Sequence, residues 1–336
     1  MTPRLDFASD TTAPAAPEVL QALGEANAGY AASYGDDDWS ARAGDLVRGL
    51  LDADAEVRFV ASATAANAIC VAALARPFEA VLAHSEAHIL THEAGAPGLF
   101  GHGVGLIGLP GDTGKIDPAA FEEALRQPDV SYMQSPAALS ITTPTEYGGV
   151  YPTAAMRALG MRAKAAGLGV HVDGARLANA IAAGFDAKTL KSYTDLLVFG
   201  GAKAGMIGTE AIVIFNKALS RRFDARLKQA GQLPAKGRYY AAPFIGMLQD
   251  GAMVRYAAHA NAMAAKLAAA APFPLRHPVE SNAAFLDIGA EQLAALNARG
   301  WMVYPFEDGS VRFTTAWCTS EEAVEELIAD MTAVAG

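Results

Sequence analysis

Short apolar runs alternate along the first two thirds of the chain with stretches in which small or apolar residues recur at helical spacing. Runs of this length, apolar on both faces, are typical of buried strands. The predicted strands cover residues 56–63, 79–84, 104–110, 129–134, 168–175, 194–201 and 210–215. Helices are predicted between them, for example over 64–75 and 152–167. Because short apolar strands separated by helices are typical of parallel sheets, we predict an α/β fold, a mostly parallel sheet sandwiched by helices.

The pattern changes after residue 216, where a basic and polar stretch is followed by an alanine-rich helix predicted over 242–271. Beyond it we predict strands at 282–288, 301–306 and 310–317, a helix at 291–300 and a final helix. This order favours a smaller α+β C-terminal domain. We therefore expect an N-terminal segment (1–15) that contributes to both the active site and the small domain, a large domain (16–240) and a small domain (241–336).

Composition narrows the class of protein. The 336 residues are 52% hydrophobic and 18% charged, as in a globular protein, and the formal net charge of −10 makes nucleic-acid binding unfavourable. The two cysteines, Cys70 and Cys318, have no metal or redox spacing, which fits a reducing compartment. The N-terminus does not resemble a signal peptide, and no apolar run is long enough to span a membrane. We expect a soluble cytoplasmic enzyme that binds neither nucleic acid nor membrane.

Two charged residues follow predicted strands. Asp173 ends the apolar strand in "VHVDGARLANA", and Lys203 lies among glycines and alanines in "FGGAKAG". Carboxyl ends of parallel strands face the crevice where such sheets bind ligands. Alone, Asp173 could cap a helix and Lys203 could extend to solvent. Together, a lysine that bonds covalently to an aldehyde and an acid that holds a pyridine nitrogen protonated are typical of pyridoxal phosphate chemistry.

That cofactor needs a phosphate-binding turn, and "VASATAAN" offers one. Ser62 and Thr64 lie where a predicted strand runs into a helix, and free N–H groups at a helix start bind phosphate well. An ordinary helix cap gives the same pattern.

Three histidines, His84, His88 and His92, recur every four residues. On one helix they would share a face and could bind zinc, with Glu86 or Glu93 completing the ligands. Alternatively one histidine stacks on a flat cofactor ring, and it or another acts as a general base, or all are surface residues. We predict no metal site.

Arg312 lies in the apolar stretch "SVRFTTAW" of the predicted small domain. A buried arginine suits a bidentate grip on a substrate carboxylate, or a structural ion pair.

At these residues the chain resembles the low-specificity L-threonine aldolase and phenylserine aldolase family, which belongs to the fold-type I pyridoxal phosphate enzymes. The resemblance covers nearly the whole chain, and its specific part is "HVDGARLANA" followed by "FGGAKAG". Further matching segments, in chain order, are "FASDTTAP", "YGDDDWS", "SATAAN", "EAHILTHEAGAPGLFG", "GKIDP", "TEYGGVYP", the full stretch "FGGAKAGMIGTEAIV" and "VRFTTAW". "YGDDDWS" resembles an interface and active-site segment.

For cofactor binding, the resemblance implies that Lys203 bonds to pyridoxal 5'-phosphate, that Asp173 faces its ring nitrogen and that His88 stacks on the ring. The phosphate would be held by Ser62, Ala63 and Thr64, and by Arg226 and Lys228 from a neighbouring subunit. The family often has glycine where this chain has Ala63.

For the substrate, the resemblance implies that Ser9, Arg176 and Arg312 hold the carboxylate, with Arg176 also near the cofactor. Many relatives carry a second active-site histidine that the segment 134–149 lacks. The base for the β-hydroxyl is therefore open between His88, His92 and an ordered water.

The implied activity is that of a lyase, an aldehyde-lyase of the threonine aldolase type. It would cleave the Cα–Cβ bond of L-threonine, L-allo-threonine or a related β-hydroxy-α-amino acid such as phenylserine, reversibly, to glycine and an aldehyde. A homo-oligomer, a dimer or dimer of dimers, is implied. The alternatives are β-elimination or racemisation on the same fold, a metal-dependent hydrolase built on the three histidines, and a non-catalytic binding protein. The sequence leaves open the preferred aldehyde, the stereochemical preference and the choice between dimer and tetramer.

Overall fold

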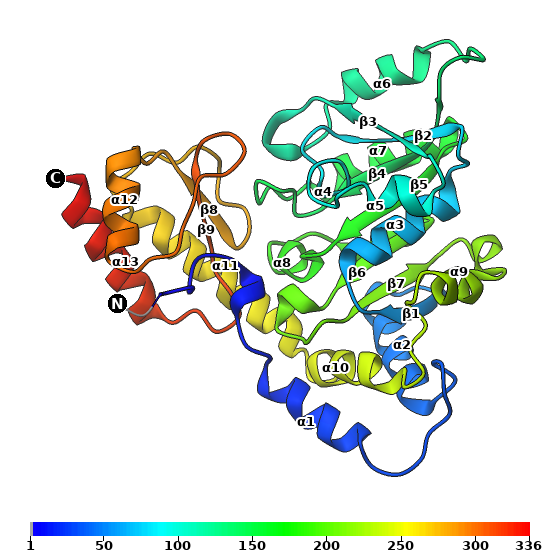
Figure 1. Cartoon of the computed structure of the whole chain (residues 1–336), viewed down its shortest axis with the longest axis horizontal. Coiled ribbons are helices and arrows are strands. Elements are labelled where there is room, and N and C mark those ends of the chain that lie inside the picture. The colour runs from blue at the N-terminus through cyan, green and yellow to red at the C-terminus, as the bar shows by residue number, and fades with distance from the viewer. Residues whose placement is uncertain (1–2) are drawn as a thin grey trace.

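The computed structural model describes residues 3–336 and is organised around a seven-stranded sheet (Figure 1). The strand order is β1-β7-β6-β5-β4-β2-β3. All neighbours pair in parallel except β7, which is antiparallel to both β1 and β6. The strands are β1 (Glu56–Val60), β2 (Glu79–His84), β3 (Gly105–Leu109), β4 (Ser135–Thr142), β5 (Gly169–Gly174), β6 (Leu196–Gly200) and β7 (Glu210–Ile214). The predicted mostly parallel sheet is confirmed.

Helices cover both faces of this sheet, as Figure 1 shows for α3 on one face and α7 on the other. Strands β5, β6 and β7 are almost wholly buried, which explains why they read as continuous apolar runs. The helices in this part are α1 (Pro17–Ala26), α2 (Asp38–Leu51), α3 (Ala63–Leu74), α4 (His88–Thr91), α5 (Ala96–Phe100), α6 (Pro118–Arg126), α7 (Thr153–Ala165), α8 (Leu177–Ala182), α9 (Phe223–Gln229) and α10 (Arg238–Leu248).

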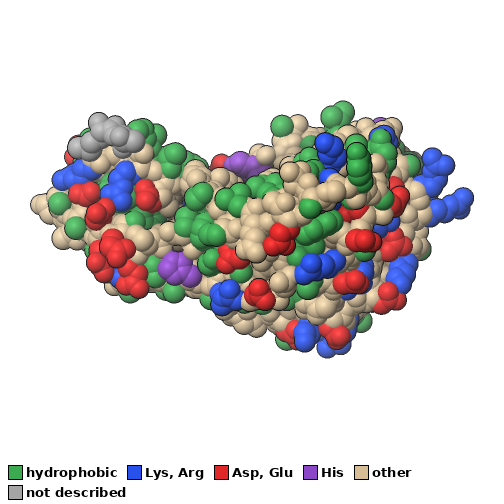
Figure 2. Space-filling model, turned by 90° about the horizontal axis from the view of Figure 1, so that it is seen from below, with side chains coloured by type: hydrophobic (Ala, Val, Ile, Leu, Met, Phe, Trp, Pro, Cys, Tyr) green, Lys and Arg blue, Asp and Glu red, His purple; other side chains and the backbone are tan. Residues whose placement is uncertain are grey.

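A smaller unit follows, built on an antiparallel pair, β8 (Ala283–Leu286) and β9 (Val311–Thr314). Helices α11 (Ala252–Ala270), α12 (Ala290–Ala298) and α13 (Glu321–Ala335) pack beside it around their own buried cluster. The expected α+β unit is therefore present. Figure 2 shows the molecule narrowing between this unit and the larger one, with acidic and basic side chains interspersed on that face.

The N-terminal segment packs on the smaller unit. Arg4 pairs with Glu326 at 2.6 Å and bridges to Trp301, and Phe7 lies in the same buried cluster, where its ring contacts Trp301 at 5.6 Å between centroids. The predicted boundaries at residues 15/16 and 240/241 stay predictions. Residues 1 and 2 of the predicted segment 1–15 lie outside the described residues.

Three element predictions are wrong. Residues 129–134 form no strand; β4 begins at Ser135 and contains Pro136, which is accommodated where the β2–β4 register shifts. The helix predicted over 242–271 is two helices, because Gly251 adopts φ +67° and separates α10 from α11. The segment 301–306 makes isolated bridges instead of a strand.

No helix within residues 3–336 has the length and apolarity needed to cross a membrane.

Candidate active site

The carboxyl end of β5 places Asp173 in the interior. Asp173 is 2% exposed, and its two carboxylate oxygens accept from different groups. Asn67 Nδ2 donates to Oδ2 at 2.8 Å, and the backbone N–H of Ala175 donates to Oδ1 at 2.9 Å. These bonds fix the plane of the carboxylate, since each oxygen has its own donor. Asp173 therefore caps the Ala175 amide and still presents a buried carboxyl group at the sheet edge.

Lys203 follows β6 in a single 3₁₀ turn, Ala202–Ala204, and is half-buried. The glycines beside it are required: a Cβ on Gly200 would lie 2.1 Å from the Ala175 carbonyl oxygen, and Gly205 has φ +90°. Nearby Arg176, together with burial, lowers the pKa of Lys203. A lysine amine with a lowered pKa is a better nucleophile at neutral pH.

Glu210 anchors the other end of the Lys203 loop. Because β7 is antiparallel, its first residue lies at the same edge as the carboxyl ends of β5 and β6. Glu210 accepts from the Gly201 backbone N–H at 2.6 Å, and burial raises the Glu210 pKa to about 7. This hydrogen bond joins Gly201, at the start of the loop that carries Lys203, to Glu210, at its end.

The three residues predicted to bind a substrate carboxylate are brought together around Asp10. Arg176 grips Asp10 with both fork atoms, Nε to Oδ2 at 2.6 Å and Nη2 to Oδ1 at 2.9 Å. Ser9 caps the turn at Asp10–Thr12, and its hydroxyl lies 3.4 Å from Asp10 Oδ1. Burial and the nearby charge of Arg176 lower the pKa of Arg312.

Arg312 is less committed to protein partners than Arg176. Its Nη2 donates to Tyr304 Oη at 3.2 Å, whereas its Nε is buried and has no partner within residues 3–336. An unpaired buried guanidinium donor is costly, so this side chain is poised to take an anionic ligand.

His88 begins helix α4 and is tied to the buried carboxylate of Glu93, with Nδ1 to Oε1 at 2.9 Å. Asn67 Nδ2 donates to the same oxygen at 2.8 Å, so Asn67 links Glu93 to Asp173. The hydrogen bond to Glu93 raises the pKa of His88, whereas burial raises the pKa of Glu93. Glu146, from the segment that lacks a histidine, accepts from the His88 backbone N–H at 3.1 Å.

The three histidines do not share a helical face. His84 ends β2, where its Nε2 lies 3.1 Å from the Gly111 carbonyl oxygen. The ring of His92 stacks on that of His88 at 5.6 Å between centroids, and its Nε2 pairs with Glu307 at 3.1 Å. Within residues 3–336 no group of three potential ligands is arranged to hold a metal ion.

The turn before α3 holds the three residues predicted to bind a phosphate, Ser62, Ala63 and Thr64. The Ser62 hydroxyl accepts from the Ala65 N–H at 3.2 Å, so this residue is a helix cap. The N–H groups of Ala63 and Thr64, in the first turn, have no protein acceptor among the described residues. Gln232 Oε1 accepts from Ala61 N–H at 2.9 Å and fixes the approach to the turn. The helix-cap interpretation of Ser62 is confirmed, and phosphate binding at this turn stays a prediction.

Arg226 and Lys228 lie on α9, away from Lys203. Arg226 donates to the Ala72 carbonyl oxygen at 3.1 Å, and Lys228 Nζ lies 4.3 Å from the centre of the Tyr34 ring. Tyr34 belongs to "YGDDDWS", so the two segments predicted to act across subunits are neighbours.

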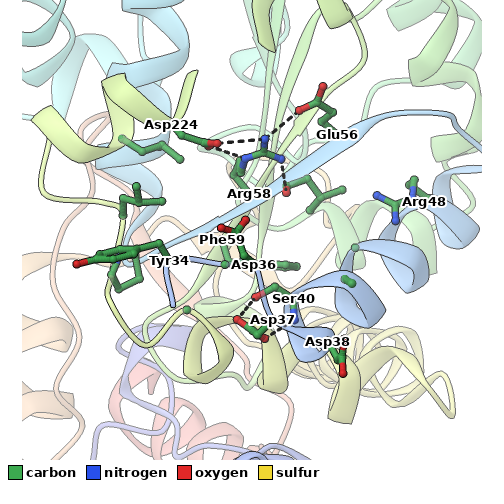
Figure 3. A pocket seen from close by; sticks show the side chains of 18 residues that line it. Tyr34, Asp36, Asp37, Asp38, Ser40, Arg48, Glu56, Arg58, Phe59 and Asp224 are labelled. Atoms are coloured by element: carbon green, nitrogen blue, oxygen red, sulfur yellow. Dashed lines mark hydrogen bonds and ion pairs between the residues drawn. The ribbon is translucent and has the colours of Figure 1, made fainter. Parts of the chain in front are cut away.

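A pocket lies between these two segments (Figure 3). On one side Arg58 pairs with Glu56 and Asp224, and on the other Asp37 accepts from Ser40. None of the predicted site residues lines this pocket.

Sequence reasoning missed Asp10, Asn67 and Glu210 as parts of the site and considered Glu93 only as a metal ligand. Asn67 carried a usable signal, since an amide on an otherwise apolar helix needs a partner. Asp10 and Glu210 lay inside matching segments without a pattern that marked them.

The residues fit pyridoxal 5'-phosphate. The site offers a buried carboxyl group for a ring nitrogen, an amine with lowered pKa, a histidine face and two unpaired amides at a helix start. Asp173, near the end of β5, and Lys203, just after β6, lie at the same edge of the sheet because these two strands are parallel neighbours.

Known proteins share this architecture. The low-specificity L-threonine aldolase of Pseudomonas aeruginosa is 43% identical over 98% of both chains. A threonine aldolase structure from Leishmania major is 31% identical, covers 98% of this chain and 99% of its own, and has a TM-score of 0.93. N-succinyldiaminopimelate aminotransferase from Mycobacterium tuberculosis, 20% identical with a TM-score of 0.71 over 96% and 91% of the two chains, shares the fold.

The match to the beta-eliminating lyase family spans residues 6–291. The predicted fold class and the predicted resemblance are both confirmed, and the chain belongs to the beta-eliminating lyase family, among the low-specificity L-threonine aldolases.

Proposed function

We infer that this protein is an aldehyde-lyase that cleaves the Cα–Cβ bond of L-threonine, L-allo-threonine or a related β-hydroxy-α-amino acid, reversibly, to glycine and an aldehyde. The single observation that carries this function is the glycine-bounded Lys203, its pKa lowered by Arg176, on the strand next to the one that ends at Asp173. Pyridoxal 5'-phosphate, when bound, supplies a ring that accepts the electron pair left on Cα.

Lys203 acts in its neutral form. The positive charge of Arg176 and the removal of solvent both disfavour protonation, so the amine keeps a lone pair at lower pH than an exposed lysine would. Two donors orient the Asp173 carboxyl group, which would face the pyridine nitrogen of the cofactor and favour its protonated form. Ser62, Ala63 and Thr64 form the turn that would hold the phosphate, with the amides of Ala63 and Thr64 as donors.

Substrate orientation falls to Arg312, Arg176 and Ser9. The Nε of Arg312 is buried and has no partner within the described residues, whereas the guanidinium of Arg176 is held in place by Asp10. A substrate carboxylate would therefore find a free donor on Arg312 and a fixed positive charge on Arg176. Fixing the carboxylate sets which bond of Cα is broken.

The β-hydroxyl proton must be removed as the Cα–Cβ bond breaks, and Cα must gain a proton to give glycine. His88 is our candidate for the first transfer, because Glu93 orients its ring. His92 stacks behind it and stays an alternative, as does an ordered water.

We further propose a cytoplasmic homo-oligomer, a dimer or a homotetramer. The contact between the two segments supports it: Lys228 Nζ lies 4.3 Å from the centre of the Tyr34 ring, and Tyr34 lines a pocket that also has acidic and basic side chains (Figure 3). In this arrangement Arg226 and Lys228 serve the phosphate of a neighbouring subunit. Sedimentation velocity measures the oligomeric state directly.

The test replaces Lys203 with alanine and uses exposed Lys217, which pairs with Asp54, as the matched control. We expect Lys203→Ala to lose the visible absorbance of covalently bound cofactor and the release of acetaldehyde and glycine from L-threonine, and Lys217→Ala to keep both. Release of 2-oxobutanoate and ammonia by the wild-type enzyme would instead indicate β-elimination. A Lys203→Ala variant with unchanged absorbance and turnover would refute the assignment.

A further inference from the structure

A continuous hydrogen-bonded chain joins the two predicted ring contacts beneath the site. It runs from Asp173 Oδ2 to Asn67 Nδ2 at 2.8 Å, from Asn67 Nδ2 to Glu93 Oε1 at 2.8 Å, and from Glu93 Oε1 to His88 Nδ1 at 2.9 Å. Asp173, Asn67 and Glu93 are at most 4% exposed. The residues come from β5, α3 and the segment after α4, which the fold alone brings together.

The chain has a defined donor order. An amide nitrogen only donates, so Asn67 must give one hydrogen to Asp173 and the other to Glu93. Glu93 Oε1 accepts that hydrogen, and as a carboxylate oxygen it also accepts from His88, which requires a proton on Nδ1. Neutral imidazole carries one proton, so Nε2 is then left with its lone pair.

We propose that Glu93 is a positioning residue that fixes His88 as the Nδ1–H tautomer with Nε2 free to accept a proton, and that Asn67 locks this pair to Asp173. The proposal rests on the proposed function, because it makes His88 Nε2 the acceptor for the β-hydroxyl proton. Glu93 would thus orient His88 in a site whose segment 134–149 carries no second histidine.

Charged groups around His88 come from several elements. Glu93, Glu146 and Asp173 raise the pKa of its ring, whereas burial and Lys203 lower it, and His92 stacks against it. Glu93 is the one that hydrogen-bonds the ring itself; Glu146 bonds only the backbone N–H. Removing the Glu93 charge should therefore affect the ring proton more than removing any other carboxylate.

Glu93 Oε2 and Asn67 Oδ1 are buried and have no partner within residues 3–336. Leaving these two acceptors unpaired costs stability, because a buried polar group without a partner keeps its desolvation penalty. A buried network with unpaired acceptors that links Asp173 to His88, the two residues predicted to contact the cofactor ring, is typical of a functional site.

The first experiment determines the His88 tautomer in the wild-type enzyme and uses one variant only to assign the signals. Full-length enzyme with ¹⁵N-labelled histidine, with and without added pyridoxal phosphate, is examined by NMR, and His88→Asn identifies the His88 signals. We expect the Nδ1–H form in the wild type. A wild-type enzyme whose neutral His88 carries its proton on Nε2 would overturn the proposal.

The second experiment measures the pH profile of L-threonine cleavage and the His88 titration in Glu93→Gln, with Glu86→Gln as the matched control. Glu86 lies two residues from His88 but does not contact its ring within the described residues. We expect Glu93→Gln to lower the His88 pKa by roughly one unit, with the acid limb of kcat/KM moving equally, as loss of a neighbouring charge predicts. Glu86→Gln should leave both unchanged.

Glu93→Ala separates orientation from charge. Without an acceptor at Nδ1 the two tautomers mix, and kcat should fall up to about 100-fold, the lower range of what a positioned base contributes, with KM little changed. An unchanged His88 pKa in Glu93→Gln would overturn the proposal. Failure of the wild-type enzyme to release glycine would refute the proposed function, while the tautomer measurement would still decide the role of Glu93.

Discussion

The Asp10–Arg176 pair offers the sharpest test of how the site is held. Asp10 has no exposed side-chain surface, and it accepts two bonds from Arg176 and one from Asn282 Nδ2 at 3.1 Å. Replacing Asp10 with alanine leaves the guanidinium in the interior without its counter-charge. Breaking a buried pair by removing one partner costs about 3–5 kcal/mol, because the remaining charge keeps its desolvation penalty.

The loss should depend on pH in a defined direction. Burial acts to raise the pKa of Asp10, but Arg176, with Lys203 and Asn282, outweighs it and holds the value below the ordinary 3.8. A carboxyl whose folded pKa is depressed contributes stability that is complete above its unfolded pKa and lost as the pH falls through the folded one. The stability difference between wild type and Asp10→Ala should therefore be full at neutral pH and shrink below about pH 4.

The assay is thermal unfolding of the cofactor-free protein between about pH 3 and 8, a range that includes the intact pair and the pH at which its contribution should shrink. We expect Asp10→Ala to lower the midpoint by on the order of 10 °C. The control is Asp54→Ala, which breaks the exposed pair with Lys217 and should leave the midpoint unchanged. Equal shifts in the two variants, or a loss below 1 kcal/mol for Asp10→Ala, would refute this account of the buried pair.

Three further outcomes are expected. Gly160→Ala should destabilise the protein by roughly 1–3 kcal/mol and so lower its unfolding midpoint, because the new Cβ would lie 2.2 Å from the Tyr193 ring. Gly24→Ala on α1, where the added Cβ meets open space, is the control. Glu210→Gln should remove a decline in stability between about pH 4.5 and 7, since burial raises the Glu210 pKa to about 7 and its ionisation then opposes folding; a pH series of midpoints checks this. Arg312→Ala should raise KM for L-threonine more than it changes kcat if the fork binds the carboxylate in ground and transition states alike, and an unchanged KM would contradict that role.

Much of the fold could be predicted because burial leaves a direct mark on the sequence. The strand that carries Asp173 and the strand that precedes Lys203 are buried on both faces, so apolar residues dominate them, with His171 as a buried exception before Asp173. β4 was missed because Pro136 argues against a strand, and its tolerance depends on a register shift with a distant neighbour. The mainly apolar stretch 130–133 has the sequence pattern of a strand, yet Tyr132 is 84% exposed.

The site was predictable only where one residue carries its own signal. Lys203 is unusual in its surroundings, and Asp173 ends a strand. The partners that hold the predicted residues are far apart in sequence: 106 positions separate Asn67 from Asp173, and 166 separate Asp10 from Arg176. Such pairings follow from how the strands are ordered in the sheet, which periodicity does not encode.

The N-terminal segment has a consequence for how the protein is made. Arg4 pairs with Glu326 of α13, 322 positions further along the chain, and the backbone N–H of Thr314 donates to the carbonyl oxygen of Phe7. Domains generally fold from the N-terminal side during synthesis, but these contacts cannot form until β9 and α13 have been translated. The segment that carries Arg4 and Phe7 therefore gains these partners only after all seven strands of the large sheet have been made.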